Sequence, residues 1–198
     1  MRDPLGRLLP GLPRSVRVVL DWVLTIAGAI LIVVALKAWV VNPYRIPSSS
    51  MEPTLHCARP GAGCLASEMD FVAIRPYGSS DPRRGDIVAF RTPHEAFVKC
   101  GAGGTYVKRV IGLPGESWSE RGGYVYIDGR RLVEPYITAD RRDDRSMSGG
   151  PIPAGGYLVL GDNRASSCDS RIWGFVPRKN LIGRAVEIKR GSKRIHIR

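Results

Sequence analysis

The chain has 198 residues and a formal net charge of +12. Its 43% hydrophobic content, with 23 glycines and 15 prolines, is typical of a turn-rich globular protein and excludes a disordered chain. The basic residues are scattered and no run of aromatic residues interleaves them, so the charge favours an anionic lipid surface over nucleic acid as the partner. An ordinary basic surface on a soluble protein remains the alternative.

An apolar segment near the N-terminus is long enough to cross a membrane. It runs from Trp22 to Val41 and carries one charge, Lys37. As a helix rising about 1.5 Å per residue, it would span about 30 Å, the thickness of a hydrocarbon core. Trp22 and Trp39 lie where aromatic belts occur, and Lys37 can extend to the far interface. A cleaved signal peptide is the alternative, but no small-x-small site follows the segment.

The position of this segment predicts the domain organisation. Residues 1–17 hold three prolines and four arginines and are expected to form a disordered cytoplasmic tail. Residues 18–41 are the predicted anchor, and 42–198 the predicted extracytoplasmic domain. Since no second apolar run follows, we expect a single-pass protein of the cell membrane.

Beyond the anchor, the sequence favours short strands over helices. Asp128-Gly129 supplies the positive φ of a tight hairpin between two of them. Residues 134–153, rich in Arg, Asp, Ser and Gly, are expected to form a mobile loop. We therefore predict a single mostly-β domain. The expected strands are 86–90, 106–111, 124–127, 130–133, 157–160, 185–189 and, more weakly, 194–197.

The four cysteines can pair in three ways, and an extracytoplasmic site permits disulfides. A turn-forming run separates Cys57 from Cys64, which favours a bridge between them and leaves Cys100 with Cys168 by elimination. No C-x-x-C motif occurs, so a zinc site is not expected, and the sequence indicates no other metal or cofactor.

Three consecutive serines, Ser48–Ser50, follow the anchor and lie between Pro47 and Pro53. Each proline fixes its own φ and disfavours helix in the residue before it, so we expect an extended, stiff segment. A serine there acts as a nucleophile only if a base activates it. The alternative is a linker between the anchor and the domain.

Lys108 is the candidate base. On the predicted strand 106–111 it shares a face with Tyr106 and Val110, which indicates burial. Burial lowers the pKa of a lysine, and a neutral amine can take the proton of a serine. The alternative is an ordinary edge-strand lysine with its amine in water. A further stretch, Gly161–Gly174, is dense in hydrogen-bonding side chains and could orient a buried amine.

Together and in this order, these segments resemble bacterial type I signal peptidase, a membrane-bound serine protease with a Ser/Lys dyad. A single anchor and a compact domain are similar to the Gram-positive form of that family. The resemblance implies a mostly antiparallel β-sheet domain, along whose edge the substrate pairs as an extended strand. The matching segments are Pro47–Leu55, Arg84–Val88, Tyr106–Gly115 and Gly161–Gly174.

The resemblance also implies a role for each site residue. Ser50 would be the nucleophile, Lys108 the general base, and Ser48 a donor to the oxyanion. Ser167 would orient Lys108. Two further residues would brace the loop that holds Ser167: Asp169 and Arg171. Shallow pockets for small substrate side chains would be lined by Ile46, Pro47, Met51, Leu55, Tyr106 and Val107.

The predicted function is removal of signal peptides from exported preproteins, after sites of the Ala-x-Ala type. Signal-peptide-bearing preproteins and membrane lipids are the implied partners. Two alternatives remain open at this point. One is a non-catalytic, membrane-anchored basic β module, and the other is a Ser/Lys peptidase dedicated to one substrate.

Overall fold

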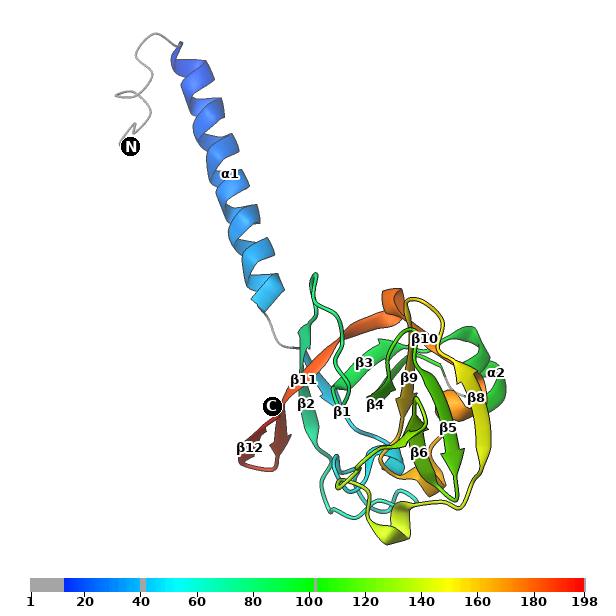
Figure 1. Cartoon of the computed structure of the whole chain (residues 1–198). Coiled ribbons are helices and arrows are strands. Elements are labelled where there is room, and N and C mark those ends of the chain that lie inside the picture. The colour runs from blue at the N-terminus through cyan, green and yellow to red at the C-terminus, as the bar shows by residue number, and fades with distance from the viewer. Residues whose placement is uncertain (1–12, 40–41, 102, 198) are drawn as a thin grey trace. The chain divides into compact units, whose positions relative to one another are not determined.

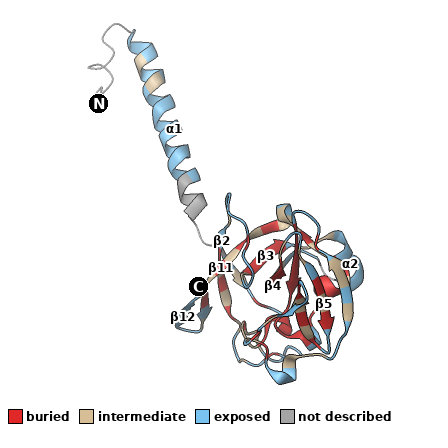
Figure 2. Ribbon diagram, viewed as in Figure 1, coloured by how far each residue is buried: buried red, intermediate tan, exposed pale blue. Residues whose placement is uncertain are grey.

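The computed structural model describes residues 13–39, 42–101 and 103–197, which fall into two compact units, Met1–Val40 and Val41–Arg198 (Figure 1). The first unit contains one long helix, α1 (Arg14–Trp39). Within it, Arg14–Val34 is long and apolar enough to cross a membrane. Its side chains are mostly exposed (Figure 2), as expected of a helix that meets lipid instead of protein.

Helix α1 begins four residues before the predicted anchor boundary, so Arg14–Arg17 are helical and not part of an irregular tail. The interfacial positions predicted for Lys37 and Trp39 concern side chains outside the described residues, as does the predicted disorder of residues 1–12.

The second unit is built from two antiparallel sheets, which confirms the predicted fold class. The larger sheet has the order β1-β2-β11-β3-β4-β9-β10, with β12 paired to β11, and the smaller has the order β7-β6-β5-β8. The strands of the larger sheet are β1 (Asn42–Arg45), β2 (Phe71–Pro76), β3 (Ile87–Arg91), β4 (Thr105–Gly112), β9 (Gly156–Leu160), β10 (Val176–Pro177), β11 (Leu181–Arg190) and β12 (Lys193–His196). Those of the smaller sheet are β5 (Ser117–Arg121), β6 (Tyr124–Ile127), β7 (Arg130–Arg131) and β8 (Met147–Pro151).

Short helical turns connect the strands. They are the α-helices α2 (His94–Cys100) and α3 (Ser170–Trp173) and the 3₁₀ turns η1 (Ser49–Met51), η2 (Ala139–Arg141), η3 (Arg164–Ser166) and η4 (Arg178–Asn180).

Strand β3 lies at the centre of the larger sheet and is buried on both faces (Figure 2). Ile87 and Ala89 pack into one apolar cluster, while Val88 and Phe90 pack into another on the opposite face. A strand covered on both sides favours a continuous apolar run, which is why this segment is easily found in the sequence. Strand β4, its neighbour, carries Lys108.

The prediction of a mobile loop over residues 134–153 is wrong for its second half, which forms strand β8. This strand contains two glycines and a proline, so its composition resembles a loop. Gly149 lies directly against the indole of Trp118, where a Cβ atom would overlap the ring. The glycine is therefore required by close packing. Strand β2 was not among the expected strands either.

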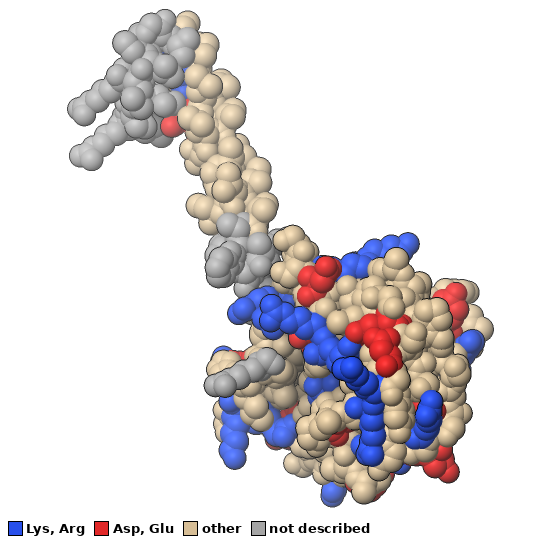
Figure 3. All heavy atoms as spheres, viewed as in Figure 1, with Lys and Arg blue, Asp and Glu red and all other residues tan. Residues whose placement is uncertain are grey.

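The outer face of strands β1, β2, β11 and β12 is basic. Directly opposite residues in antiparallel strands point to the same side, and Arg184 pairs with Arg75 while Lys189 pairs with both Phe71 and Arg194. Figure 3 shows Lys and Arg side chains gathered in a stripe on one side of this unit. We call the following outward cations the basic face: Arg45, Arg75, Arg184, Lys189 and Arg194.

The cysteines form two disulfides. Cys57 pairs with Cys64 at a Cα–Cα distance of 5.1 Å, and Cys100 pairs with Cys168 at 6.3 Å. The first closes a loop just after the three serines, and the second joins the end of α2 to the stretch between η3 and α3.

Candidate active site

Ser50 lies in the 3₁₀ turn η1, which follows strand β1 and a short extended segment. The expectation that all three serines are extended is wrong, because only Ser48 has extended backbone angles. A proline restricts the residue directly before it, and Glu52, before Pro53, is indeed extended. The serines between are free to turn. Asn163 fixes this turn by donating from its backbone N–H to the Ser50 carbonyl at 3.1 Å.

Lys108 reaches Ser50 from strand β4. Its Nζ donates to Ser50 Oγ at 2.6 Å, and the side chain is only 4% exposed. Ser48 Oγ lies 3.1 Å from Ser50 Oγ on the other side. Burial lowers the pKa of Lys108 to about 8, although the carboxylates of Asp169 and Asp162 oppose this change. A large fraction of this amine is therefore neutral in mildly alkaline solution.

An ion-pair cluster holds the loop behind Lys108. The Asp169 carboxylate accepts from Arg171 Nε at 2.8 Å and from Arg171 Nη2 at 2.9 Å, and also from the Gly161 N–H at 3.1 Å. Burial alone would raise the pKa of Asp169, but the hydrogen bonds and charge of Arg171 outweigh it and hold that pKa below its usual range. Arg171 also pairs with Glu120 and Asp143. Asp169 and Arg171 are thus placed to brace this loop.

A second ion pair, which the sequence analysis missed, ties the serine segment to the same loop. Arg109 donates to both oxygens of Asp162, at 2.9 and 2.6 Å, and Thr54 Oγ1 donates to the same carboxylate at 2.6 Å. All three residues lie inside the segments quoted above. A fully buried carboxylate needs such partners. The sequence signal for this ion pair was therefore the position of Asp162, an acidic residue just beyond an apolar strand.

Ser167 is brought close to the serines but does not bind Lys108 in this structure. It is buried, and its hydroxyl makes no hydrogen bond to Lys108 but acts on the Asp169 carboxylate, whose pKa it helps to lower. Gly161 packs against both Ser167 and the Ser50 carbonyl, since a Cβ atom at Gly161 would overlap them. The orienting role expected for Ser167 is therefore not supported by a direct contact with Lys108.

A cleft of about 450 Å³ opens beside Ser50 and Lys108. It contains five of the six residues predicted to bind substrate, and Leu55 is the exception. Leu55 has no exposed surface and packs in the core with Val72 and Ile74, because its N–H bonds the Met51 carbonyl and the chain turns inward. The lining residues are Arg45, Ile46, Pro47, Ser48, Ser50, Met51, Gly103, Thr105, Tyr106, Val107, Lys108, Ser166 and Cys168.

No metal-binding cluster accompanies this cleft. Among the residues that the structure describes, no group of three His, Cys, Asp or Glu side chains is placed to hold a metal ion.

Comparison with known proteins identifies the family. The family model for signal peptidase, peptidase S26, matches residues 19–189. The chain belongs to this family. It is a serine endopeptidase, as the sequence resemblance implied, and helix α1 makes it a membrane-anchored one.

Curated relatives of this S26 peptidase extend over most of its length. It is 38% identical to signal peptidase I of Leptolyngbya laminosa, over 88% of this chain and 81% of that protein. It is 39% identical to a probable signal peptidase I-2 of Synechocystis, over 81% of this chain and 68% of that protein. The corresponding values for signal peptidase I of Bacillus amyloliquefaciens are 34%, 83% and 84%. A solved signal peptidase I from Enterococcus faecalis aligns over 53% of this chain and 97% of that chain, with 33% identity and a TM-score of 0.44.

Proposed function

We propose that this enzyme removes signal peptides from exported preproteins by a Ser50/Lys108 dyad. The observation that carries the proposal is the 2.6 Å contact between Lys108 Nζ and Ser50 Oγ inside a cleft. A buried amine with a lowered pKa is suited to act as general base. Several relatives in the same family are named signal peptidase I, which supports the choice of substrate.

The reaction begins when neutral Lys108 takes the proton of Ser50 and Ser50 Oγ attacks the scissile carbonyl. The Ser48 hydroxyl and the Ser50 N–H donate to the oxyanion that develops, a contribution of about 3 kcal/mol for one such donor. The Lys108 ammonium then gives its proton to the leaving amine, and an acyl-enzyme remains. Lys108 then takes a proton from water, which attacks the ester, and the Lys108 ammonium returns that proton to Ser50 Oγ as the acyl–oxygen bond breaks.

The cleft supports specificity for small residues before the cleavage site. Its apolar wall combines Ile46 and Met51 from the serine segment with Tyr106 and Val107 from β4. Ile46 and Met51 are almost completely buried, so this wall is firmly packed, and we expect it to accept side chains the size of alanine. The substrate would lie extended along the cleft, with an Ala-x-Ala sequence against this wall.

The membrane arrangement is part of the same proposal. We propose a cytoplasmic N-terminus, which Arg14 and Arg17 at the start of α1 favour, and a peptidase unit that lies outside the cytoplasm after a single span. Strand β1, which carries Arg45 of the basic face, begins three residues after α1 ends. The charge of the basic face suits contact with anionic lipid headgroups.

The test incubates the full-length protein in detergent with a preprotein that carries Ala-x-Ala before its cleavage site. We expect Ser50→Ala and Lys108→Ala to abolish processing, while Lys179→Ala, a change at an exposed lysine, leaves it intact. Processing by all forms at the same rate would refute the dyad. A panel of preproteins separates a general signal peptidase from an enzyme dedicated to one substrate.

A further inference from the structure

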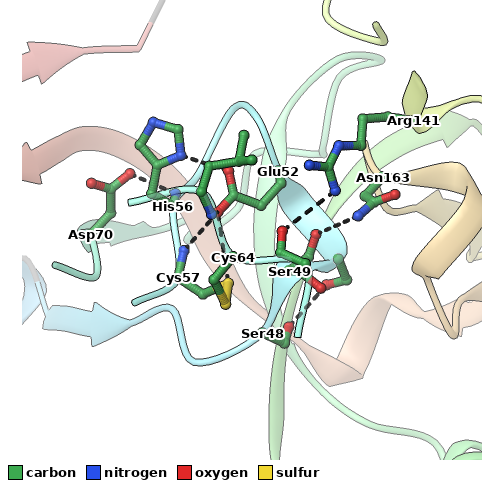
Figure 4. The surroundings of a disulfide bond; sticks show 12 residues. Ser48, Ser49, Glu52, His56, Cys57, Cys64, Asp70, Arg141 and Asn163 are labelled. Atoms are coloured by element: carbon green, nitrogen blue, oxygen red, sulfur yellow. Dashed lines mark hydrogen bonds and ion pairs between the residues drawn. A yellow bond between two sulfur atoms is a disulfide. The ribbon is translucent and has the colours of Figure 1, made fainter. Parts of the chain in front are cut away.

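A disulfide-closed loop packs against the turn that carries Ser50. We call residues Cys57 to Cys64 the 57–64 loop (Figure 4). Gly63, near its end, has a φ of +75°, and a Cβ atom there would lie 2.9 Å from Ser49 Oγ. The loop thus approaches the residue before the nucleophile so closely that only glycine fits.

Glu52 joins the same turn to both ends of the loop. It follows Ser50 by two residues and is completely buried. Its Oε1 accepts the N–H groups of Cys57 and Leu65, each at 3.1 Å, and its Oε2 lies 2.6 Å from His56 Nδ1. Figure 4 shows the Glu52 side chain pointing toward His56 and Cys57. Hydrogen bonds to a buried carboxylate are stronger than those between neutral groups, so these contacts are stiff.

Asn163 holds the turn from the other side. Its backbone N–H donates to the Ser50 carbonyl at 3.1 Å, and its side-chain amide donates to the Ser49 carbonyl at 3.0 Å. The turn is therefore held between the 57–64 loop and Asn163, while Lys108 sits on a separate element, strand β4. Slippage of the turn relative to β4 would lengthen the contact between Lys108 Nζ and Ser50 Oγ.

We propose that Glu52 and the Cys57–Cys64 disulfide are positioning elements that hold Ser50 in line with Lys108. This inference rests on the proposed function, because it assigns a task within that dyad. None of the three residues lines the cleft. Their loss therefore lowers kcat and leaves KM nearly unchanged, whereas loss of a cleft residue raises KM.

The experiment measures kcat and KM of the full-length enzyme and divides kcat by the folded fraction, obtained from a tryptophan-fluorescence melt in the same buffer. For Glu52→Ala and for the double variant Cys57→Ala/Cys64→Ala, we expect kcat per folded molecule to fall by about 10- to 100-fold, as small displacements of reacting groups do. We expect Glu52→Gln to stay within about threefold of wild type, because its carbonyl oxygen still accepts both N–H groups.

A matched control separates positioning from folding. Asp86→Ala removes another carboxylate with two partners, Tyr77 Oη and the Arg83 N–H, and should lower the melting temperature without changing kcat per folded molecule. If Glu52→Ala has the wild-type kcat per folded molecule, the positioning inference is overturned while the proposed function stands. Should Glu52→Ala fail to fold, the same result in the double cysteine variant decides the question. Activity in Ser50→Ala would overturn the proposed function as well.

Discussion

Burying the Lys108 amine must reduce the stability of the fold at neutral pH. The ordinary pKa is 10.5 and burial lowers it to about 8. At 1.36 kcal/mol for each pH unit, this difference corresponds to about 3 kcal/mol. We therefore predict that Lys108→Met, which keeps all but one atom of the side chain's length and removes the charge, stabilises the protein by about 3 kcal/mol at pH 7 and abolishes its activity.

The two pKa values also determine whether stability rises or falls with pH. Between about pH 8 and 10.5 the unfolded chain binds the lysine proton and the folded protein does not, so wild-type stability rises with pH across this window. The penalty is fully present below pH 8. In urea unfolding, the free energy of unfolding of Lys108→Met should thus exceed that of wild type by a large amount at pH 7 and by little at pH 10.5.

Activity should also rise as the Lys108 amine loses its proton. With a pKa of about 8, about one tenth of Lys108 is neutral at pH 7, so kcat/KM should rise about tenfold toward pH 9. Lys179→Met, at an exposed position, is the control and should match wild type in both measurements. A variant Lys108→Met that is less stable than wild type at pH 7, or equally stabilised at both pH values, would refute the reasoning.

Three further predictions concern neighbouring residues. Ser48→Ala should lower kcat by about 10²–10³-fold with little change in KM, the loss typical of one oxyanion donor; an unchanged kcat would remove Ser48 from this role. Leu55→Ala should cost about 2–5 kcal/mol in urea unfolding and leave KM unaltered, whereas Ile46→Ala should raise KM, because only Ile46 lines the cleft. Arg171→Met leaves the Asp169 carboxylate buried without its cation and should destabilise the fold by about 3–5 kcal/mol; a stability equal to wild type would contradict this.

The sequence was most informative where burial leaves a regular pattern. Strands β3, β4, β9 and β11 are apolar runs or alternations, and the Asp128-Gly129 hairpin has a signature of its own. Strand β8 gave no strand pattern in the sequence because Gly149 packs against the Trp118 ring and Gly150 adopts a positive φ of 65°. The residue composition of a strand therefore predicts the strand only where its own side chains pack into the core.

The site was predictable in its residues more than in its contacts. The position of Lys108 on one face of β4 follows from alternation, but its 2.6 Å distance to Ser50 depends on pairing residues 58 positions apart. Leu55 shows the reverse problem. It adjoins the serine motif in sequence, yet one turn of backbone carries it into the core. Proximity along the chain could not distinguish a cleft residue from a core residue.

The two disulfides have a consequence for when the enzyme becomes active. One closes the loop against Ser49, and the other includes Cys168 in the cleft wall. A newly made chain carries thiols at all four positions, and disulfides form only in an oxidising compartment. The mature geometry is therefore a product of two oxidation steps after synthesis. With the peptidase unit outside the cytoplasm, as proposed above, export would act as the maturation signal, and the supply of oxidant there would set how quickly new molecules become active.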